Sequence, residues 1–243
     1  QQVEEFKKTK KAPMPEGVSN KALYRDILRI AWPSMIELAL TQLASMVDLM
    51  MVGNLSYEAV TAVGLTTQPK FILMMMIQAL CVGTTAMVAR YKGAGKPDKA
   101  NLIMRQSLLL TLTIGIILAV LGYVLTNPLL RLVGAKDAKS IADAGTYFRI
   151  QMIGFVPLAL TFVFTAALRG AGDSRTAMIY NTTANIVNVI FNWLLIYGNL
   201  GFPALGIAGA SIATVIGQCT AFVMALYNVL RKSDKKYLHL NFM

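Results

Sequence analysis

Charged residues are scarce in this sequence of 243 amino acids. Only 14% of the residues are charged, whereas a soluble domain carries about 25%. Hydrophobic residues make up 56% of the chain and form several runs long enough to cross a bilayer. These proportions exclude an ordinary soluble domain and predict an integral membrane protein.

Cysteine and histidine are also nearly absent. Cys81 and Cys219 lie far apart within apolar segments, without the paired spacing of a disulfide framework or a metal site. His239 is the only histidine, and no nucleophile–base pair or metal-ligand spacing accompanies it. The glycine-containing segment 90–105 lacks the GxxxxGK[ST] pattern of a phosphate-binding loop. The sequence therefore predicts neither an enzyme nor a protein with a cofactor.

The basic residues lie between the apolar segments. The formal net charge is +11, which in a soluble chain would suggest a nucleic-acid partner. Here no such partner is expected, because the charges do not follow one folded face. Eighteen of the 23 Lys and Arg residues fall on one side of the predicted topology, near the two ends of the chain and in the even-numbered connections. By the positive-inside rule, both termini are then cytoplasmic. The other five are Lys70, Arg131, Lys136, Lys139 and Arg149.

Six apolar segments predict an all-α bundle of six transmembrane helices over residues 27–231. A basic cytoplasmic tail, residues 1–26, precedes it, and residues 232–243 follow it. Pro33, Pro69 and Pro157 are expected to kink the helices that contain them. The predicted spans are 27–53, 58–91, 101–126, 144–168, 176–197 and 206–230.

The first span carries polar groups that are costly at membrane depth. Glu37, Thr41, Ser45 and Asp48 fall on one stripe of a helix, and Gln42 lies beside them. An ionisable side chain there costs about 2.5 to 3.5 kcal/mol on insertion scales and usually faces a cavity or a partner. The stripe therefore indicates an ion or substrate route. The alternative is that both carboxylates only hydrogen-bond to neighbouring helices.

Two later spans carry polar stripes of their own. Asparagines recur in the fifth span at intervals of four, three and four residues, which places Asn181, Asn185, Asn188 and Asn192 on one face. This stripe suggests a wetted cavity or an ion site, although asparagine also joins membrane helices by simple hydrogen bonds. In the sixth span Ser211, Thr214 and Gln218 share a polar face, and small residues at 206, 209, 210 and 213 allow a neighbouring helix to approach closely.

Five segments resemble the multidrug and toxic compound extrusion (MATE) family in order and spacing. They are VDLMMVGNL, ARYKGAGKPDKA, LRGAGDSRTAM, NIVNVIFNWLLIYG and GIAGASIATVI. The resemblance runs from about Pro33 to Leu230 and covers only the N-terminal six-helix lobe of a twelve-helix transporter. It implies a second lobe, or a second copy of the chain, and makes residues 232–243 the start of an inter-lobe linker.

The resemblance also implies an activity. MATE transporters are multi-pass proteins that exchange Na+ or H+ for bulky amphipathic, often cationic, compounds by alternating access; a bacterial cytoplasmic membrane is the expected location. Asp48 matches the family's cation or proton position, Asn188 and Asn192 match its polar pair, and Thr214 is the best placement for a further ligand. Asn192 stands where some members carry Asp, which weakens the case for a relay of two carboxylates. No metal site is expected beyond Na+ at Asp48. The expected cavity-lining residues are Glu37, Gln42, Ser45, Gln68, Asn181, Asn185, Ser211 and Gln218.

Two other functions fit a bundle of this kind. A flippase for lipid-linked precursors is expected to line its cavity with several basic residues, whereas the polar groups predicted at membrane depth here are acidic or neutral. A non-transporting membrane scaffold would use the asparagines only to join helices. Replacing Asp48 would then change expression but not ion-dependent flux.

Overall fold

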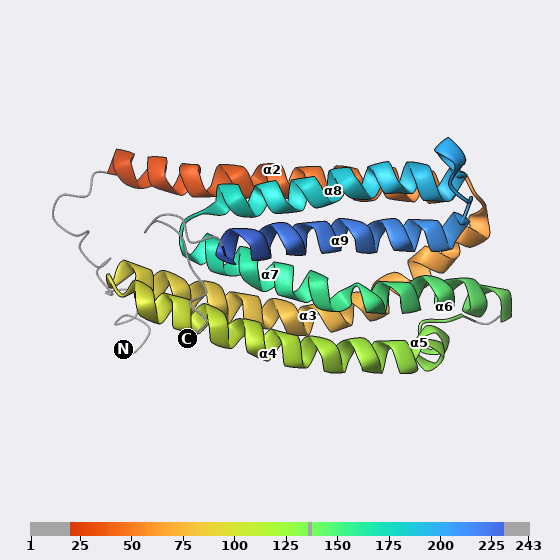
Figure 1. The fold of residues 1–243 in the computed structure, drawn as a ribbon, viewed down its shortest axis with the longest axis horizontal. Helices are drawn as coiled ribbons and strands as arrows, with labels where there is room; N and C mark the ends of the chain where they lie inside the picture. Colours follow the sequence, from red (N-terminus) through yellow and green to blue (C-terminus); the bar gives the residue numbers. More distant parts are fainter. Residues whose placement is uncertain (1–19, 136–137, 231–243) are drawn as a thin grey trace, which may run out of the picture.

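A computed structural model of the chain describes residues 20–135 and 138–230, which form an elongated bundle of helices (Figure 1). The described residues contain helices and no strands, which confirms the predicted all-α class. The helices are α2 (Asn20–Gly53), α3 (Tyr57–Gly93), α4 (Pro97–Val124), α5 (Thr126–Leu132), α6 (Ala138–Ile153), α7 (Phe155–Gly170), α8 (Ser174–Tyr197) and α9 (Gly206–Leu230), with the short 3-10 helix η1 (Asn199–Gly201) before α9.

Several of these helices are long and apolar enough to cross a membrane. Residues 31–53 of α2, together with α3, α4 and α9, meet this condition singly, and α6 and α7 meet it as a bent pair. Among the described helices of comparable length, α8 is the one that does not, since its asparagines lower its hydropathy. The chain is therefore a multi-pass membrane protein whose outward-facing Leu, Ile and Val side chains meet lipid.

The structure departs from the predicted spans at several places, one of which is that α6 begins at Ala138 and not at residue 144. Helix α2 begins at Asn20, inside the predicted tail. The predicted helix over 144–168 is two helices, because α6 and α7 meet at Gly154 with a bend of 49°. Pro157 explains the break, since proline has no N–H to donate to the carbonyl of Ile153. His239, Lys136, the linker 232–243 and most of the predicted tail lie outside the described residues.

Four apolar clusters hold the described part of the bundle together, and two of them are large. One joins α3, α4, α7, α8 and α9 through buried side chains such as Val88, Met104 and Tyr180. The other joins α3 and α4 to the bent pair through Ile77, Phe148 and their neighbours. Figure 1 shows α2 beside α8 on the opposite side of the bundle from α4, and it shows the first residue of α2 at the same end as the last residue of α9. A smaller apolar cluster, with Val52, Ile196 and Ala210 among its members, packs one end of α2 against α8 and α9, and polar contacts join the same three helices along the rest of their length.

Helices α8 and α9 approach each other unusually closely. A Cβ atom added to Gly209 would lie 2.5 Å from the carbonyl oxygen of Leu195, and one added to Gly217 would lie 2.7 Å from that of Ala184. Neither distance leaves room for a side chain. The glycines therefore set how near the polar face of α9 comes to the asparagines of α8.

Candidate cation site between α2, α8 and α9

Helices α2 and α8 lie parallel and in register. Asn181 donates to Glu37 Oε1, Asn185 Nδ2 donates to Thr41 Oγ1 at 3.2 Å, and Asn192 Nδ2 donates to Asp48 Oδ1 at 2.6 Å. The partners are 144 residues apart in every pair. A constant offset means that the polar stripe of α2 and the asparagine stripe of α8 face each other along much of their length.

Asp48 lies where this ladder meets α9. The hydrogen-bond network assigns the Asn188 amide with its nitrogen toward the carboxylate, 2.8 Å from Oδ2 and 2.9 Å from Oδ1, and with its oxygen 3.1 Å from the backbone N of Thr214. Asn188 and Asn192 are 6% and 1% exposed. The structure therefore brings together the four predicted cation-site residues, Asp48, Asn188, Asn192 and Thr214.

This arrangement offers oxygen atoms in a largely dry place. The carboxylate of Asp48 is one source, and Asn192 Oδ1 is a second, because it is buried and has no hydrogen-bond partner. Hard cations such as Na+ prefer oxygen ligands, and a carboxylate can alternatively take a proton. Within the described part of the chain, no group of three or more His, Cys, Asp or Glu residues could hold a metal ion. The oxygen atoms near Asp48 therefore come from one carboxylate and from neutral side chains.

Glu37 belongs to a second polar cluster, nearer the Asn20 end of α2. It pairs with Arg169 of α7 as well as with Asn181, in the only ion pair among the described residues. Glu37 is 8% exposed at its side chain and Arg169 is 34% exposed. This contact agrees with the interpretation in which a membrane carboxylate only hydrogen-bonds to neighbouring helices. Glu37 and Asp48 thus have different partners, and Glu37 is not part of the Asp48 site.

The remaining predicted cavity residues take different positions. Gln42, Ser45 and Gln68 are exposed on the outside of the bundle, and Ser45 donates to the Thr41 carbonyl at 3.0 Å. Ser211 is buried and donates to the Tyr147 carbonyl at 2.8 Å. Gln218 Oε1 is buried without a hydrogen-bond partner. The predicted set therefore does not line a single cavity within this bundle.

Lys70 corrects the sequence analysis. The charge count assigned it to the outer side and the polar groups at membrane depth were expected to be acidic or neutral, but Lys70 lies inside α3 and donates to Gln151 Oε1 of α6 at 2.8 Å. Its place directly after Pro69, within an apolar stretch, was the available signal. A single membrane-depth lysine is still far from the several basic residues that a flippase cavity implies.

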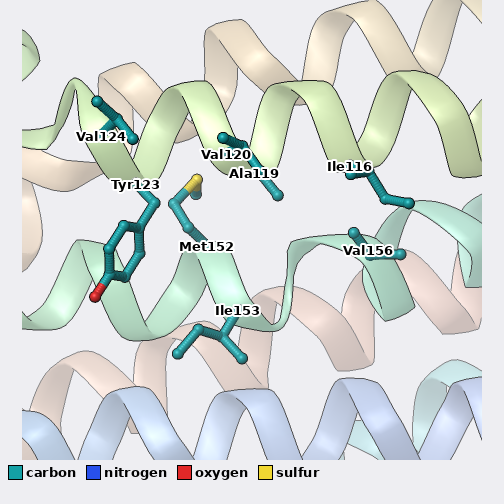
Figure 2. A pocket seen from close by; sticks show the side chains of 8 residues that line it. All are labelled: Ile116, Ala119, Val120, Tyr123, Val124, Met152, Ile153 and Val156. Atoms are coloured by element: carbon teal, nitrogen blue, oxygen red, sulfur yellow. The ribbon is translucent and has the colours of Figure 1, made fainter.

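The structure also contains an apolar pocket of about 300 Å³, shown in Figure 2. It lies between α4 and the bend of α6 and α7, where Tyr123 and Val124 face Met152 and Ile153. No residue of the Asp48 site lines it. The pocket thus belongs to the apolar exterior and is separate from the polar groups described above.

Comparison with known proteins agrees with this geometry. The MatE family model matches residues 33–194, well over half of the chain. A probable multidrug resistance protein NorM from Thermotoga maritima is 28% identical over 210 residues, which cover 86% of this chain and 45% of that protein. The chain spans about half the length of the curated relatives that it matches.

The chain also resembles about half of several solved transporter structures. A multidrug resistance MATE family transporter of the MOP superfamily in an outward-facing conformation is 26% identical, with a TM-score of 0.81 over 88% of this chain and 47% of the other. The inward-facing conformation of such a transporter is 27% identical, with a TM-score of 0.73 over 87% and 47%. The likeness is thus greater to the outward-facing form. These relatives are transporters and not enzymes, and the chain described here belongs to the MatE family.

Proposed function

We propose that this chain is the N-terminal six-helix lobe of a cation-coupled antiporter. In this proposal Na+ or H+ binds at Asp48, with Asn188, Asn192 and Thr214 around it, and a bulky amphipathic compound, often cationic, leaves by alternating access. The observation that carries the proposal is the Asp48 carboxylate held by two buried amides where α2, α8 and α9 meet. An ionisable group in such a place usually marks an ion route.

The coupling would work through the α2–α8 contact. A cation bound at Asp48 competes with the hydrogen bonds that the carboxylate accepts from Asn188 and Asn192. Its binding therefore changes the free energy of the contact between α2 and α8. A cation can bias the two access states only if it binds them with different affinity. A site built from three helices, rather than from one, meets this requirement, because any shift of α2 alters its geometry.

The topology in this proposal has six crossings with both termini in the cytoplasm. Helix α8 counts as a crossing although its hydropathy is low, since its asparagine side chains are paired with α2 and α9 and not exposed to lipid. The excess of Lys and Arg on one side and the shared end of α2 and α9 support the same arrangement. The bacterial names of the relatives support a cytoplasmic membrane.

A second lobe is part of the proposal. The chain matches about half of each relative, and Gln42, Ser45 and Gln68 point outward from the bundle. Polar groups facing hydrocarbon are costly. A C-terminal six-helix lobe, or a second copy of this chain, would cover them and complete a substrate path between the two halves.

The test replaces Asp48 by Asn in the protein expressed from its full reading frame. The amide keeps the size and the hydrogen bonds but can neither carry a proton nor present a charge, so efflux driven by an ion gradient should fall to background. Efflux of a fluorescent cationic compound from vesicles measures this at matched protein abundance. Asp98→Asn, at an exposed position in the first turn of α4, is the control and should transport normally. Wild-type efflux in Asp48→Asn would instead show that Asp48 is not the coupling site.

A further inference from the structure

The apolar pocket in Figure 2 opens toward the lipid that surrounds the bundle. Its lining comes from α4 and from both sides of the α6–α7 bend, which belong to the helices long and apolar enough to cross a membrane. Most of the lining side chains are exposed, whereas Met152 among them is buried. Because exposed apolar side chains of membrane helices meet hydrocarbon, the pocket faces the bilayer interior and not water.

Hydrocarbon is the material that fits this pocket. Apart from the Tyr123 hydroxyl, the lining side chains are apolar, so a water molecule would find few partners there. An apolar cavity of about 150 Å³ already holds a benzene molecule, and this pocket of about 300 Å³ has room for a segment of an acyl chain. A lipid tail is as apolar as the lining, so its gain comes from dispersion contacts that an unfilled hollow would lose.

A half-buried arginine lies at one end of the pocket. Arg149 comes one helical turn before Ile153 on the same face of α6. Its Nη2 donates to Asn127 Oδ1 of α5 at 3.3 Å. Since Asn127 follows Val124 by only three residues, Arg149 is at the Val124 end of the pocket. Among the described residues the single ion pair lies elsewhere, so no carboxylate there is within 4.0 Å of this guanidinium.

We propose that the pocket binds one phospholipid, with an acyl chain in the pocket and the phosphate at Arg149. Arginine binds phosphate through short, charge-assisted hydrogen bonds, and tyrosine is common where membrane helices meet the headgroup layer. Figure 2 shows Tyr123 and Val124 at one end of the pocket and Ile116 and Val156 at the other, so the chain would run along α4. This site is independent of the proposed cation site, which shares no residue with it.

The first experiment tests the headgroup contact. Phosphatidylglycerol is titrated into the protein from the full reading frame in detergent, and native mass spectrometry counts the bound lipids. The wild type should bind one lipid more tightly than any further one. Arg149→Gln should weaken this first binding at least about tenfold, the change that a hydrogen bond to a charged group can supply. Arg131→Gln, which removes an exposed arginine of α5, is the control and should bind like the wild type. Diacylglycerol has the tails without the phosphate and should bind wild type and Arg149→Gln equally weakly.

The second experiment tests the acyl chain by filling the pocket. Val120→Trp puts a larger side chain at an exposed position of the lining and should also weaken the first binding. Leu109→Trp, at an exposed position of α4 outside the lining, is the control and should leave it unchanged. Ile153→Trp, at another exposed lining position, replaces Val120→Trp if that variant does not fold.

Three outcomes overturn the proposal. If no lipid binds more tightly than the rest, the pocket is not a lipid site, as it would be if another part of the protein covered it. If Arg149→Gln weakens the binding and the tryptophan in the pocket does not, the acyl chain lies elsewhere. If the tryptophan weakens the binding and Arg149→Gln does not, the phosphate is not at this arginine.

Discussion

The four asparagines of α8 look alike in the sequence but differ in their surroundings. Asn188 and Asn192 are buried and contact the Asp48 carboxylate, whereas Asn181 is half-buried and contacts Glu37, whose carboxylate is already paired with Arg169. Asn185 contacts only the hydroxyl of Thr41. Interhelical hydrogen bonding is thus common to all four, and contact with the proposed ion site is confined to two.

This difference gives a prediction that separates the two interpretations of the stripe. Asn188→Ala and Asn192→Ala should each weaken the dependence of efflux on the ion gradient more than Asn181→Ala does, because only they hold Asp48. Transport measured over a series of imposed gradients gives the dependence, and the melting temperature of each variant gives the structural cost. If all three variants lost the same amount of gradient dependence, the asparagines would instead serve only to join the helices.

Some of these residue contacts could be predicted from the sequence. Asp173 lies directly before the predicted span 176–197, where aspartate commonly caps a helix, and its carboxylate accepts from the Thr176 N–H at 3.1 Å at the start of α8. The grouping of Asp48 with Asn188, Asn192 and Thr214 came from the family resemblance, since no spacing rule connects three different helices. Lys70 was missed because hydropathy locates a span but does not say which side chains within it turn inward. Lys70 turns inward because it donates a hydrogen bond to Gln151 of α6, which is distant in the sequence.

Helix boundaries show a similar division. Periodicity and capping located α8 and α9 closely, since Gly198 adopts a φ of 73° at the end of α8 and Gly206 begins α9. The break between α6 and α7 was expected at Pro157 but comes at Gly154, because a proline disrupts the bond to the turn before it. Gly154 also lies against α9, where an added Cβ would be 2.6 Å from Val215. Such a contact between distant segments is not visible in one sequence.

The close approach of α8 and α9 gives a second prediction. Gly209→Ala should destabilise the protein by about 1 to 3 kcal/mol, because the new Cβ would meet the backbone of Leu195 at 2.5 Å and force the helices apart. Gly64→Ala is the matched control. It lies within α3 with nothing within 4 Å of the added atom, so it should stabilise the helix slightly. Thermal unfolding in detergent measures both. A Gly209→Ala protein as stable as Gly64→Ala would show that this contact does not set the helix spacing.

The distribution of polar and apolar surface bears on how the whole bundle is used. The α4 side carries exposed side chains such as Leu109, Ile116 and Val120, which suit lipid. On the opposite side, α2 exposes Gln42 and Ser45 among its apolar residues. The sequence could predict that a polar stripe exists, but not that part of it turns away from α8. The proposed second half of the transporter would cover this outward-facing part of α2.

The last prediction tests this surface by cross-linking. In a background with Cys81 and Cys219 replaced by Ala, Ser45→Cys should form disulfides between two copies when this chain is expressed alone, because each copy can cover the polar face of the other. Leu109→Cys, at a site 64% exposed on the opposite side, is the control and should stay unpaired, since lipid covers it adequately. Gel mobility without reductant reports the pairing, and light scattering in detergent reports the mass. A monodisperse monomer whose vesicles show cation-driven efflux would contradict the requirement for two bundles, because one bundle would then provide both the ion site and the substrate path.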